Sequence, residues 1–474
     1  MTFLRKHALA LSVTVALLVA PIFAHLFVVR LARLEPPKVS VAVPRLVDQG
    51  ALRLAGLGYA SRHDGLWEVR LRGSAAQIGV ELGRLLGPEM VHTEQRVMSM
   101  FDRYVPSRWA QPLLLDLARL RFRHLDEAMA SDRLDELAGL ALSVQPDPLA
   151  GFLPTYQRFV YLNALYDIAL TYERSPLVGC TTFVTTDQAS YQGHTLLARN
   201  FDFDVDDVFD QLKVVYVVLK DGTIPFVSIA WPGLVGVVSG MNAAGVAIVV
   251  HGGRAGELHA DGEPMIQSLR FVLEHAGTAR QAADILADRR PMVSHIVITA
   301  DADGAAFVVE RVPGRPAYRY QISTRAVVTN HLVGPSADDP KNRYVMDRTS
   351  TVQRKLRGEQ LLARLHHPAT VFNLVHMLRD RCGVNDAPLA LGDRRAIGAL
   401  IAAHGVVMDV TARKIWVSEA PHLLGKFVEF DLKPRFEPNY VPSVSAPAAP
   451  SIAADPLLTS GEYSRWKRTH HSEP

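Results

Sequence analysis

This chain of 474 residues has few cysteines and little excess of charge of either sign. It contains two cysteines, Cys180 and Cys382, so at most one disulfide can form and a disulfide-rich secreted scaffold is excluded. Its 51 basic residues face 48 acidic ones, and this balance argues against nucleic acid as a partner. Hydrophobic residues make up 48% of the chain, enough to bury a large core, so a disordered protein is excluded as well.

Residue groups with metal-ligand spacing are also missing. The acidic run with Asp204, Asp206 and Asp207 lacks the glycine and the distal glutamate of an EF-hand calcium loop. The adjacent histidines at 366–367 and 470–471 have no further ligands at zinc spacing. We therefore expect no metal and no organic cofactor.

One long apolar run lies near the N-terminus. Residues 8–29 are almost entirely apolar and follow Arg5 and Lys6, and about 20 such residues are enough to span a bilayer. No small-residue cleavage site closes the run, so we expect residues 1–34 to form an uncleaved signal anchor. The rest of the chain is then expected on the periplasmic face of a bacterial-type inner membrane, or secreted if the segment is cleaved.

Composition and hydrophobic pattern divide residues 35–474 into three parts. Residues 35–179 are rich in helix formers and are expected to form a helical segment that packs on the core. Three of its glycines recur at four-residue spacing, which predicts one helix face that packs closely against another backbone: Gly79, Gly83 and Gly87. Residues 180–432 alternate short apolar runs with turn residues, which predicts an α+β domain. Residues 433–474 show no hydrophobic period and are expected to be a disordered tail.

The strand-like runs of the α+β part include TTFVTTD at 181–187, KVVYVVL at 213–219, HIVITAD at 295–301 and KIWVSEA at 414–420. Helical patterns interrupt them around 265–288 and 350–380. Sheets with helices outside them are the expected result.

The sequence around Cys180 carries the chemistry. A hairpin would bring the run ARNFDFD back beside the strand that begins at Cys180, and so place Arg199 and Asp202 next to it. A guanidinium favours the reactive thiolate, and an aspartate can hold an amine. A cut between Gly179 and Cys180 would create an α-amine with an ordinary pKa of about 7.7 to 8.0, able to act as the base for the thiol. Each residue also has a structural interpretation: Cys180 as a core residue or as the disulfide partner of Cys382, and Asp202 as a turn cap.

Several segments in a fixed order resemble one known family. They are GSAAQIGVELGRLLG, ELAGLA, GCTTF, GHTLLARNFDFD, GMNAAGVAI, ADADGAAFVVE, VVTNHL and GVVMDVTARKIWVS, which together span most of residues 70–430. The chain resembles the acyl-coenzyme A:6-aminopenicillanate acyltransferase-like (peptidase C45) family of N-terminal-nucleophile hydrolases, which is related to choloylglycine hydrolases and acid ceramidases. The resemblance implies a four-layer αββα fold and self-cleavage before the cysteine.

The resemblance also implies roles for matched positions. Cys180 would be the nucleophile, Asp202 would interact with its amine, and Arg199 matches an arginine of choloylglycine hydrolases. Asn330 would stabilise the oxyanion. A later family arginine corresponds to Arg354 or to Arg343, and the spacing of the following leucines favours Arg354.

One departure concerns the second asparagine of choloylglycine hydrolases, where this chain reads His251, Gly252 and Gly253. A backbone N–H is one replacement for that asparagine as an oxyanion donor.

The sequence therefore predicts a self-processing cysteine amidohydrolase or acyltransferase that cleaves a small N-acyl amide through a thioester. Its α and β chains would stay together after the cut. Coenzyme A is confined to the cytoplasm, so hydrolysis is favoured over acyl transfer for an exported protein. The alternatives are a ceramidase-like lipid amidase at the membrane and a non-catalytic, membrane-tethered binding protein on the same fold.

Overall fold

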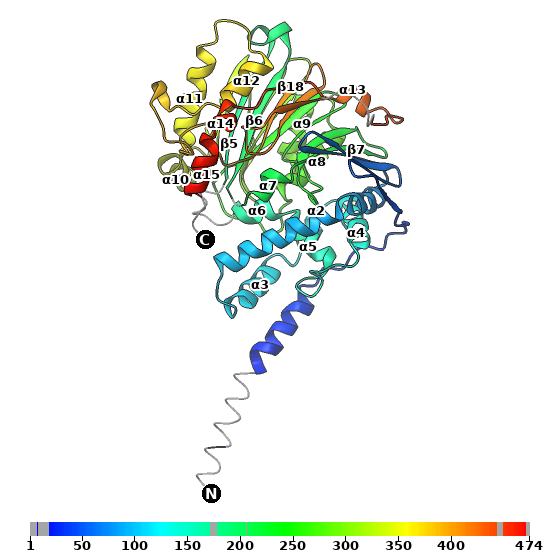
Figure 1. Ribbon diagram of the computed structural model, residues 1–474. Helices are drawn as coiled ribbons and strands as arrows, with labels where there is room; N and C mark the ends of the chain where they lie inside the picture. Colours follow the sequence, from blue (N-terminus) through cyan, green and yellow to red (C-terminus); the bar gives the residue numbers. More distant parts are fainter. Residues whose placement is uncertain (1–6, 8–18, 171–177, 205, 443–448, 471–474) are drawn as a thin grey trace.

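The computed structural model describes residue 7 and residues 19–170, 178–204, 206–442 and 449–470 (Figure 1). Two β-sheets lie at its centre. The larger has the strand order β1-β2-β3-β4-β7-β8-β9-β10-β11-β12-β13, and the smaller has the order β14-β5-β6-β15-β16-β17-β18. Neighbouring strands are antiparallel except β4 and β7, which are parallel.

The strands of the larger sheet are β1 (Leu46–Asp48), β2 (Leu52–Ala55), β3 (Gly58–His63), β4 (Leu66–Gly73), β7 (Val214–Lys220), β8 (Phe226–Ala230), β9 (Ser239–Asn242), β10 (Val246–Gly252), β11 (His295–Asp301), β12 (Ala306–Arg311) and β13 (Tyr318–Gln321). Those of the smaller sheet are β5 (Val178–Thr185), β6 (Leu196–Phe203), β14 (Arg325–Val328), β15 (Ala402–Asp409), β16 (Lys414–Ser418), β17 (Phe427–Asp431) and β18 (Ser451–Ile452).

The helices are α2 (Ala75–Tyr104), α3 (Ala110–Arg121), α4 (Ser131–Ser143), α5 (Thr155–Leu162), α6 (Leu165–Leu170), α7 (Val208–Gln211), α8 (Met265–His275), α9 (Ala279–Asp288), α10 (Pro340–Arg348), α11 (Thr351–Ala363), α12 (Val371–Leu378), α13 (Leu432–Arg435), α14 (Pro456–Thr459) and α15 (Glu462–His470).

Apolar side chains define the order of the layers. In β7, Val215 and Val217 point toward the smaller sheet, whereas Tyr216 and Val218 point toward helices α2, α4, α5, α8 and α9. Strand side chains alternate between faces, so one run fills two cores. On the far side, α11 and α12 cover the smaller sheet through residues such as Phe183. The layers are therefore helices, sheet, sheet and helices. The αββα arrangement expected for residues 180–432 also includes α2, α4 and α5 from before Cys180.

The segment before the cysteine is more than helical. Residues 35–179, expected to form only helices, also supply β1 to β4 of the larger sheet. The run LWEVRLRG of β4 alternates apolar and polar residues, which is a strand signal that the expectation overlooked. Since β4 pairs with β7, one sheet contains strands from both sides of Cys180.

Residues 433–474 also differ from the expected disordered tail. Strand β18 pairs with β17, and helix α15 packs by Trp466, whose indole N–H donates to the carbonyl of Leu391 at 2.8 Å. Arg381 and Asp455 form an ion pair at 2.8 Å. Specific polar contacts order this part, although its sequence has no hydrophobic period. Residues 443–448 and 471–474 of the expected tail lie outside the described residues.

The predicted glycine stripe marks the contact between α2 and α4. A Cβ atom on Gly79 would overlap the backbone carbonyl of Glu136, and one on Gly83 would overlap the hydroxyl of Ser143. Gly87, one turn further on, has open space instead. Close packing against another backbone is thus confirmed for Gly79, whereas Gly83 packs against a side chain and Gly87 has no close neighbour.

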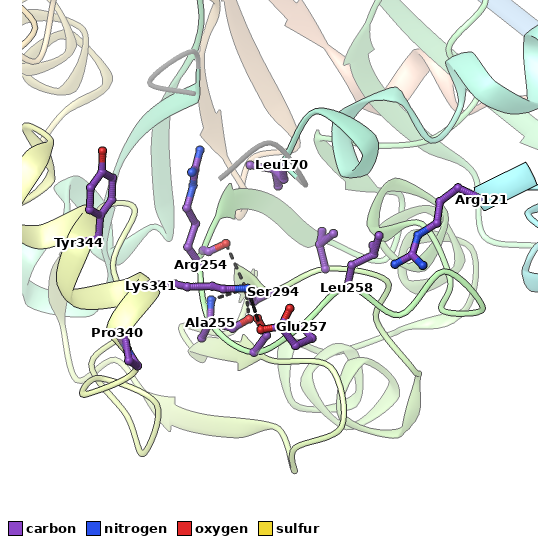
Figure 2. A pocket seen from close by; sticks show the side chains of 13 residues that line it. Arg121, Leu170, Arg254, Ala255, Glu257, Leu258, Ser294, Pro340, Lys341 and Tyr344 are labelled. Atoms are coloured by element: carbon purple, nitrogen blue, oxygen red, sulfur yellow. Dashed lines mark hydrogen bonds and ion pairs between the residues drawn. The ribbon is translucent and has the colours of Figure 1, made fainter. Parts of the chain in front are cut away.

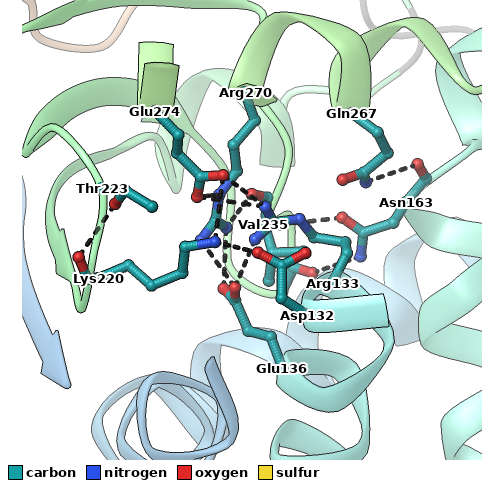
Figure 3. Close-up of polar contacts among 11 residues, drawn as sticks. Asp132, Arg133, Glu136, Asn163, Lys220, Thr223, Val235, Gln267, Arg270 and Glu274 are labelled. Atoms are coloured by element: carbon teal, nitrogen blue, oxygen red, sulfur yellow. Dashed lines mark hydrogen bonds and ion pairs between the residues drawn. The ribbon is translucent and has the colours of Figure 1, made fainter. Parts of the chain in front are cut away.

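Buried ion pairs connect α4 with elements that follow the cysteine (Figure 3). Arg133 contacts Glu136 at 2.6 Å and Glu274 of α8 at 3.1 Å. Arg270 of α8 contacts Glu136 at 2.7 Å and Glu274 at 3.0 Å. Burial raises the pKa of Glu274, but Arg270, Arg133 and Lys220 outweigh it and hold the pKa at about 2. The network therefore joins the two sides of Cys180 by charges that stay paired at neutral pH.

The N-terminal segment is only partly described. Residues 19–31 are helical, and residues 8–18 of the apolar run lie outside the described residues. No helix within the described ranges has the length and apolarity needed to cross a bilayer. The signal anchor expected at 1–34 stays a prediction.

Candidate active site

Strands β5 and β6 hold the central residues. In their register Gly179 lies opposite Asp202 and Cys180 lies opposite Phe201. Because side chains alternate along a strand, Cys180 and Arg199 point toward the larger sheet, whereas Asp202 points to the other face. Arg199 and Asp202 thus flank Cys180 as predicted, but from opposite faces of the sheet.

The thiol of Cys180 is fully buried against the larger sheet. Arg199 donates from Nη2 to the sulfur at 3.3 Å and to the carbonyl of Val250 at 2.6 Å, and its guanidinium lies 4.4 Å from the ring centre of Phe201. No carboxylate among the described residues forms an ion pair with Arg199. Burial raises the pKa of the Cys180 thiol, and the charge of Arg199 opposes this increase. A thiolate at this position would be the counter-ion of the guanidinium.

The peptide groups on either side of the Cys180 Cα are fixed by side chains. The N–H of Cys180 donates to Oδ1 of Asn330 at 2.7 Å. Arg354 of α11 donates to the carbonyl of Cys180 at 2.5 Å and to Oδ1 of Asn330 at 3.0 Å. The amide nitrogen of Asn330 donates to the carbonyl of Gly252 at 3.2 Å. Asn330 therefore holds the nitrogen that becomes the α-amine if the bond after Gly179 is cut.

Asp202 lies against Gly179. A Cβ atom on Gly179 would lie 3.0 Å from Oδ2 of Asp202, so the missing side chain lets the carboxyl approach the backbone. Burial raises the pKa of Asp202 to about 6, although Arg354, Arg394 and Arg199 act to lower it. An ammonium group formed next to it would make the carboxylate form more favourable.

The two arginine alternatives are well separated in the structure. Arg354 is buried and touches Cys180, whereas Arg343 lies exposed on α10 and pairs with Asp338 at 3.2 Å. The geometry brings Arg354 into the site and leaves Arg343 outside it.

His251 stands where choloylglycine hydrolases have their second asparagine. It is buried, and its Nε2 lies 2.7 Å from the hydroxyl of Thr182 while its Nδ1 lies 3.2 Å from the carbonyl of Thr329. Burial and then Arg199 hold the pKa of His251 well below its ordinary value, so the ring is neutral. Both nitrogens are engaged, so His251 has no donor left for a substrate.

A cleft of about 510 Å³ opens beside the Gly179–Cys180 bond. Gly179, Asp202, Asn330 and Arg354 line its inner end, and four more arginines line it: Arg254, Arg348, Arg394 and Arg395. A second cavity of about 470 Å³ shares some of these walls: Leu170, Arg254 and Tyr344. Figure 2 shows this second cavity, with Tyr344 at one end and Arg121 at the other. Cleft and cavity together form a basic depression beside the bond.

Residues 190–397 match the sequence model of the family described as acyl-coenzyme A:6-aminopenicillanic acid acyl-transferase. The predicted family resemblance is confirmed. The matched segment contains Arg199, Asp202, Asn330 and Arg354 and begins after Cys180. A protein of Archaeoglobus fulgidus described as uncharacterized is 29% identical over 252 residues, which are 50% of this chain and 40% of that protein.

Three solved structures resemble the chain at low identity. The Caenorhabditis elegans N-acylethanolamine-hydrolyzing acid amidase ortholog is 17% identical with a TM-score of 0.37, over 49% of this chain and 93% of that one. A mutant of the conjugated bile acid hydrolase from Clostridium perfringens is 10% identical with a TM-score of 0.37, over 57% and 98%. Penicillin V acylase from Agrobacterium tumefaciens is 15% identical with a TM-score of 0.33, over 53% and 92%.

Two residues at the site escaped the comparison of motifs with the acyltransferase family. Asn200 accepts the N–H of Thr181 at 2.7 Å and donates to Asp202 at 3.1 Å; its place in the run ARNFDFD is the signal that could have found it. The ring of Tyr166 of α6 lies tilted against that of Phe201, with 5.5 Å between the ring centres, and its buried hydroxyl has no hydrogen-bond partner. Only the tertiary fold brings Tyr166 to the site.

Across the described ranges no cluster of three or more His, Cys, Asp or Glu side chains is arranged to hold a metal. Cys180 and Cys382 are both free thiols, so the disulfide considered from the sequence is not formed.

Proposed function

We propose that the protein is a self-processing cysteine amidohydrolase or acyltransferase with the αββα fold of N-terminal-nucleophile hydrolases. The observation that carries the proposal is the set of polar contacts made by the thiol and the backbone of Cys180. Its thiol faces the guanidinium of Arg199, while Asn330 and Arg354 hold its N–H and carbonyl. An ordinary core cysteine needs none of these contacts.

The first reaction would be cleavage of the chain. The Cys180 sulfur attacks the carbonyl carbon of Gly179, the C–N bond breaks, and the nitrogen takes up a proton to become the α-amine. Water then hydrolyses the thioester and releases the carboxylate of Gly179. Asp202, which lies against Gly179, offers a negative charge to the new ammonium group.

The second reaction would use the same sulfur on a substrate amide. The α-amine takes the thiol proton, the thiolate attacks the acyl carbon, and the amine passes the proton to the leaving nitrogen. The side-chain amide of Asn330 donates to the oxyanion, and water resolves the acyl thioester. With both nitrogens of His251 engaged, a backbone N–H is the other available type of donor.

The charge of the cleft favours an anionic substrate. Five arginines line it, against the two carboxylates of Asp202 and Asp347, although Arg394 and Arg395 also pair with Asp204 and Asp393. Guanidinium groups bind carboxylates through paired hydrogen bonds. We therefore favour N-acyl amides whose amine part carries a carboxylate, and hydrolysis over transfer because the predicted location lacks coenzyme A.

Mass analysis of the purified protein tests the processing. Wild type should give a fragment that begins at Cys180, and N-terminal sequencing should identify it. Cys180→Ala should stay intact, whereas the matched control Cys382→Ala should be cleaved like wild type. An intact wild-type chain with a preserved fold would contradict the α-amine mechanism and favour the non-catalytic binding protein.

Matched probes test the substrate class. N-decanoylglycine ends in a carboxylate where N-decanoylethanolamine ends in a hydroxymethyl group, and released decanoate reports turnover of each. Wild type should prefer the glycine conjugate about tenfold or more in kcat/KM, as expected for one charge-assisted contact. Arg348→Ala should reduce the preference, and Arg343→Ala, on the same helix but outside the cleft, should keep it. A preference for the ethanolamide would favour the lipid amidase alternative.

A further inference from the structure

Helix α3 carries an apolar face that nothing in the described chain covers. Trp109, Leu113 and Leu117 follow one another at four-residue spacing and are 92%, 62% and 54% exposed. Arg119 is the single residue of α3 that is buried. A surface helix ordinarily turns its apolar stripe inward and its charges outward. α3 does the reverse, which is the pattern of an interaction surface.

The helical residues 19–31 extend this apolar surface. Nδ1 of His25 lies 2.8 Å from Oδ2 of Asp116 on α3, so the two helices adjoin. Figure 1 shows both on the same side of the body, away from the sheets. Phe23 and Phe27 are 67% and 65% exposed. We call the exposed apolar side chains of residues 19–31 and of Trp109 to Leu117 the apolar platform.

Arginines lie close to the α3 part of the platform in the chain. Four exposed ones are within α3 or beside it: Arg103, Arg108, Arg121 and Arg123. Asp102 is the exposed acidic residue of the same stretch, while Asp116 is engaged by His25 and Arg119. Apolar residues and tryptophan bordered by arginine are typical of helices that lie in the interface of anionic membranes. An anionic lipid surface suits both the apolar side chains and this positive charge.

We propose that the apolar platform docks on the surface of a bilayer that contains anionic phospholipid, with Trp109 at the level of the headgroups. The α3 part of this contact is separate from the predicted tether at residues 8–29, which overlaps the platform at residues 19–29, because a tether alone would leave α3 in water. The apolar sequence of residues 8–18 continues directly into the platform at residue 19. Arg121 also lines the cavity of Figure 2, so the docked surface and that cavity share a border.

Trp109 is a built-in probe for the test. Trp67 and Trp231 are buried and Trp416 and Trp466 are half-buried, so Trp109 is the one largely exposed tryptophan of the chain. Full-length protein is mixed with vesicles of phosphatidylcholine and phosphatidylglycerol, with and without brominated acyl chains. Tryptophan emission should shift to the blue and be quenched by the brominated lipid. Trp109→Phe should lose both effects.

Two controls separate docking from other causes. Adding Phe372→Trp to Trp109→Phe places a tryptophan at another exposed site, on α12, where Phe372 is 57% exposed, and its emission should not respond to vesicles. Leu113→Ser with Leu117→Ser should lower vesicle partition about tenfold, whereas Leu356→Ser, at an exposed leucine of α11, should not.

Three results would overturn the proposal. Vesicle binding without a response of Trp109 would mean that the N-terminal run alone tethers the protein. An equal response of Phe372→Trp would mean non-specific adsorption. A blue shift that needs no vesicles and grows with protein concentration would assign the platform to a second copy of the chain.

Discussion

Replacing Arg199 tests whether the guanidinium stabilises the Cys180 thiolate. Its Nη2 lies 3.3 Å from the sulfur, and no carboxylate of the described chain forms an ion pair with Arg199. Two unit charges about 4 Å apart attract by about 1 kcal/mol in water and about 4 kcal/mol at an effective dielectric constant of about 20. One pKa unit corresponds to about 1.4 kcal/mol. Arg199→Gln should therefore raise the pKa of the thiol by about 1 to 3 units, and Arg199→Lys should raise it less.

The pKa is measured from the pH dependence of modification by methyl methanethiosulfonate, a small neutral reagent, in a Cys382→Ser background. Arg379→Gln is a matched control, because Arg379 is also buried, donates to carbonyls of Leu423, Gly425 and Ala453, and lies over a phenylalanine ring. It should leave the pH profile unchanged. An unaltered profile in Arg199→Gln, or an equal shift in both glutamine variants, would refute the electrostatic argument.

Three further predictions concern packing, titration and the site. Gly79→Ala should lower the unfolding free energy by about 1 to 3 kcal/mol, because its Cβ meets a backbone carbonyl of α4. Gly87→Ala, which has open space, should raise the unfolding free energy by up to about 1 kcal/mol. Equal melting temperatures of the two variants would contradict this. In a non-cleaving background, the folded chain keeps the proton of Asp202 up to a pKa of about 6, whereas the unfolded chain loses it near pH 4. The unfolding free energy should therefore fall by about 3 kcal/mol as the pH rises from about 4 to 6. Asp202→Asn should lack this fall in melting scans across pH. Tyr156→Phe and Tyr166→Phe each remove a buried hydroxyl without a partner and should stabilise by about 1 kcal/mol, but only Tyr166→Phe should alter the turnover of an N-acyl amide; a response from Tyr156→Phe would point to a general packing effect.

Elements with a strong local pattern were predictable from the sequence. The runs at 213–219 and 295–301 became β7 and β11 because β-branched residues over such a length suit a strand that is buried on both faces. Strand β9 has the sequence SGMN, whose glycine and serine give no strand pattern, and it forms because β8 and β10 pair with it. Such strands depend on their neighbours and leave no local signal.

Among the site residues, too, some positions could be predicted from a local pattern and others could not. Arg199 and Asp202 are three residues apart on one strand, and this odd spacing places them on opposite faces, which the two-residue period alone could have predicted. Arg354 contacts a residue 174 positions away in the chain, so no local pattern could bring it to Cys180. It was predicted through the family resemblance. Tyr166 had neither signal.

The pairing of β4 with β7 has a consequence for the life of the folded protein. A cut at Gly179–Cys180 would leave one sheet built from two chains. The buried ion pairs of Arg133 and Glu136 with Arg270 and Glu274 would also connect these two chains. The uncut chain folds as a single molecule, whereas the cut chains would have to find each other again after unfolding, at a rate set by their concentration. Unfolding would then be close to a one-way event, and the persistence of the mature form would depend on its rate of opening rather than on an equilibrium.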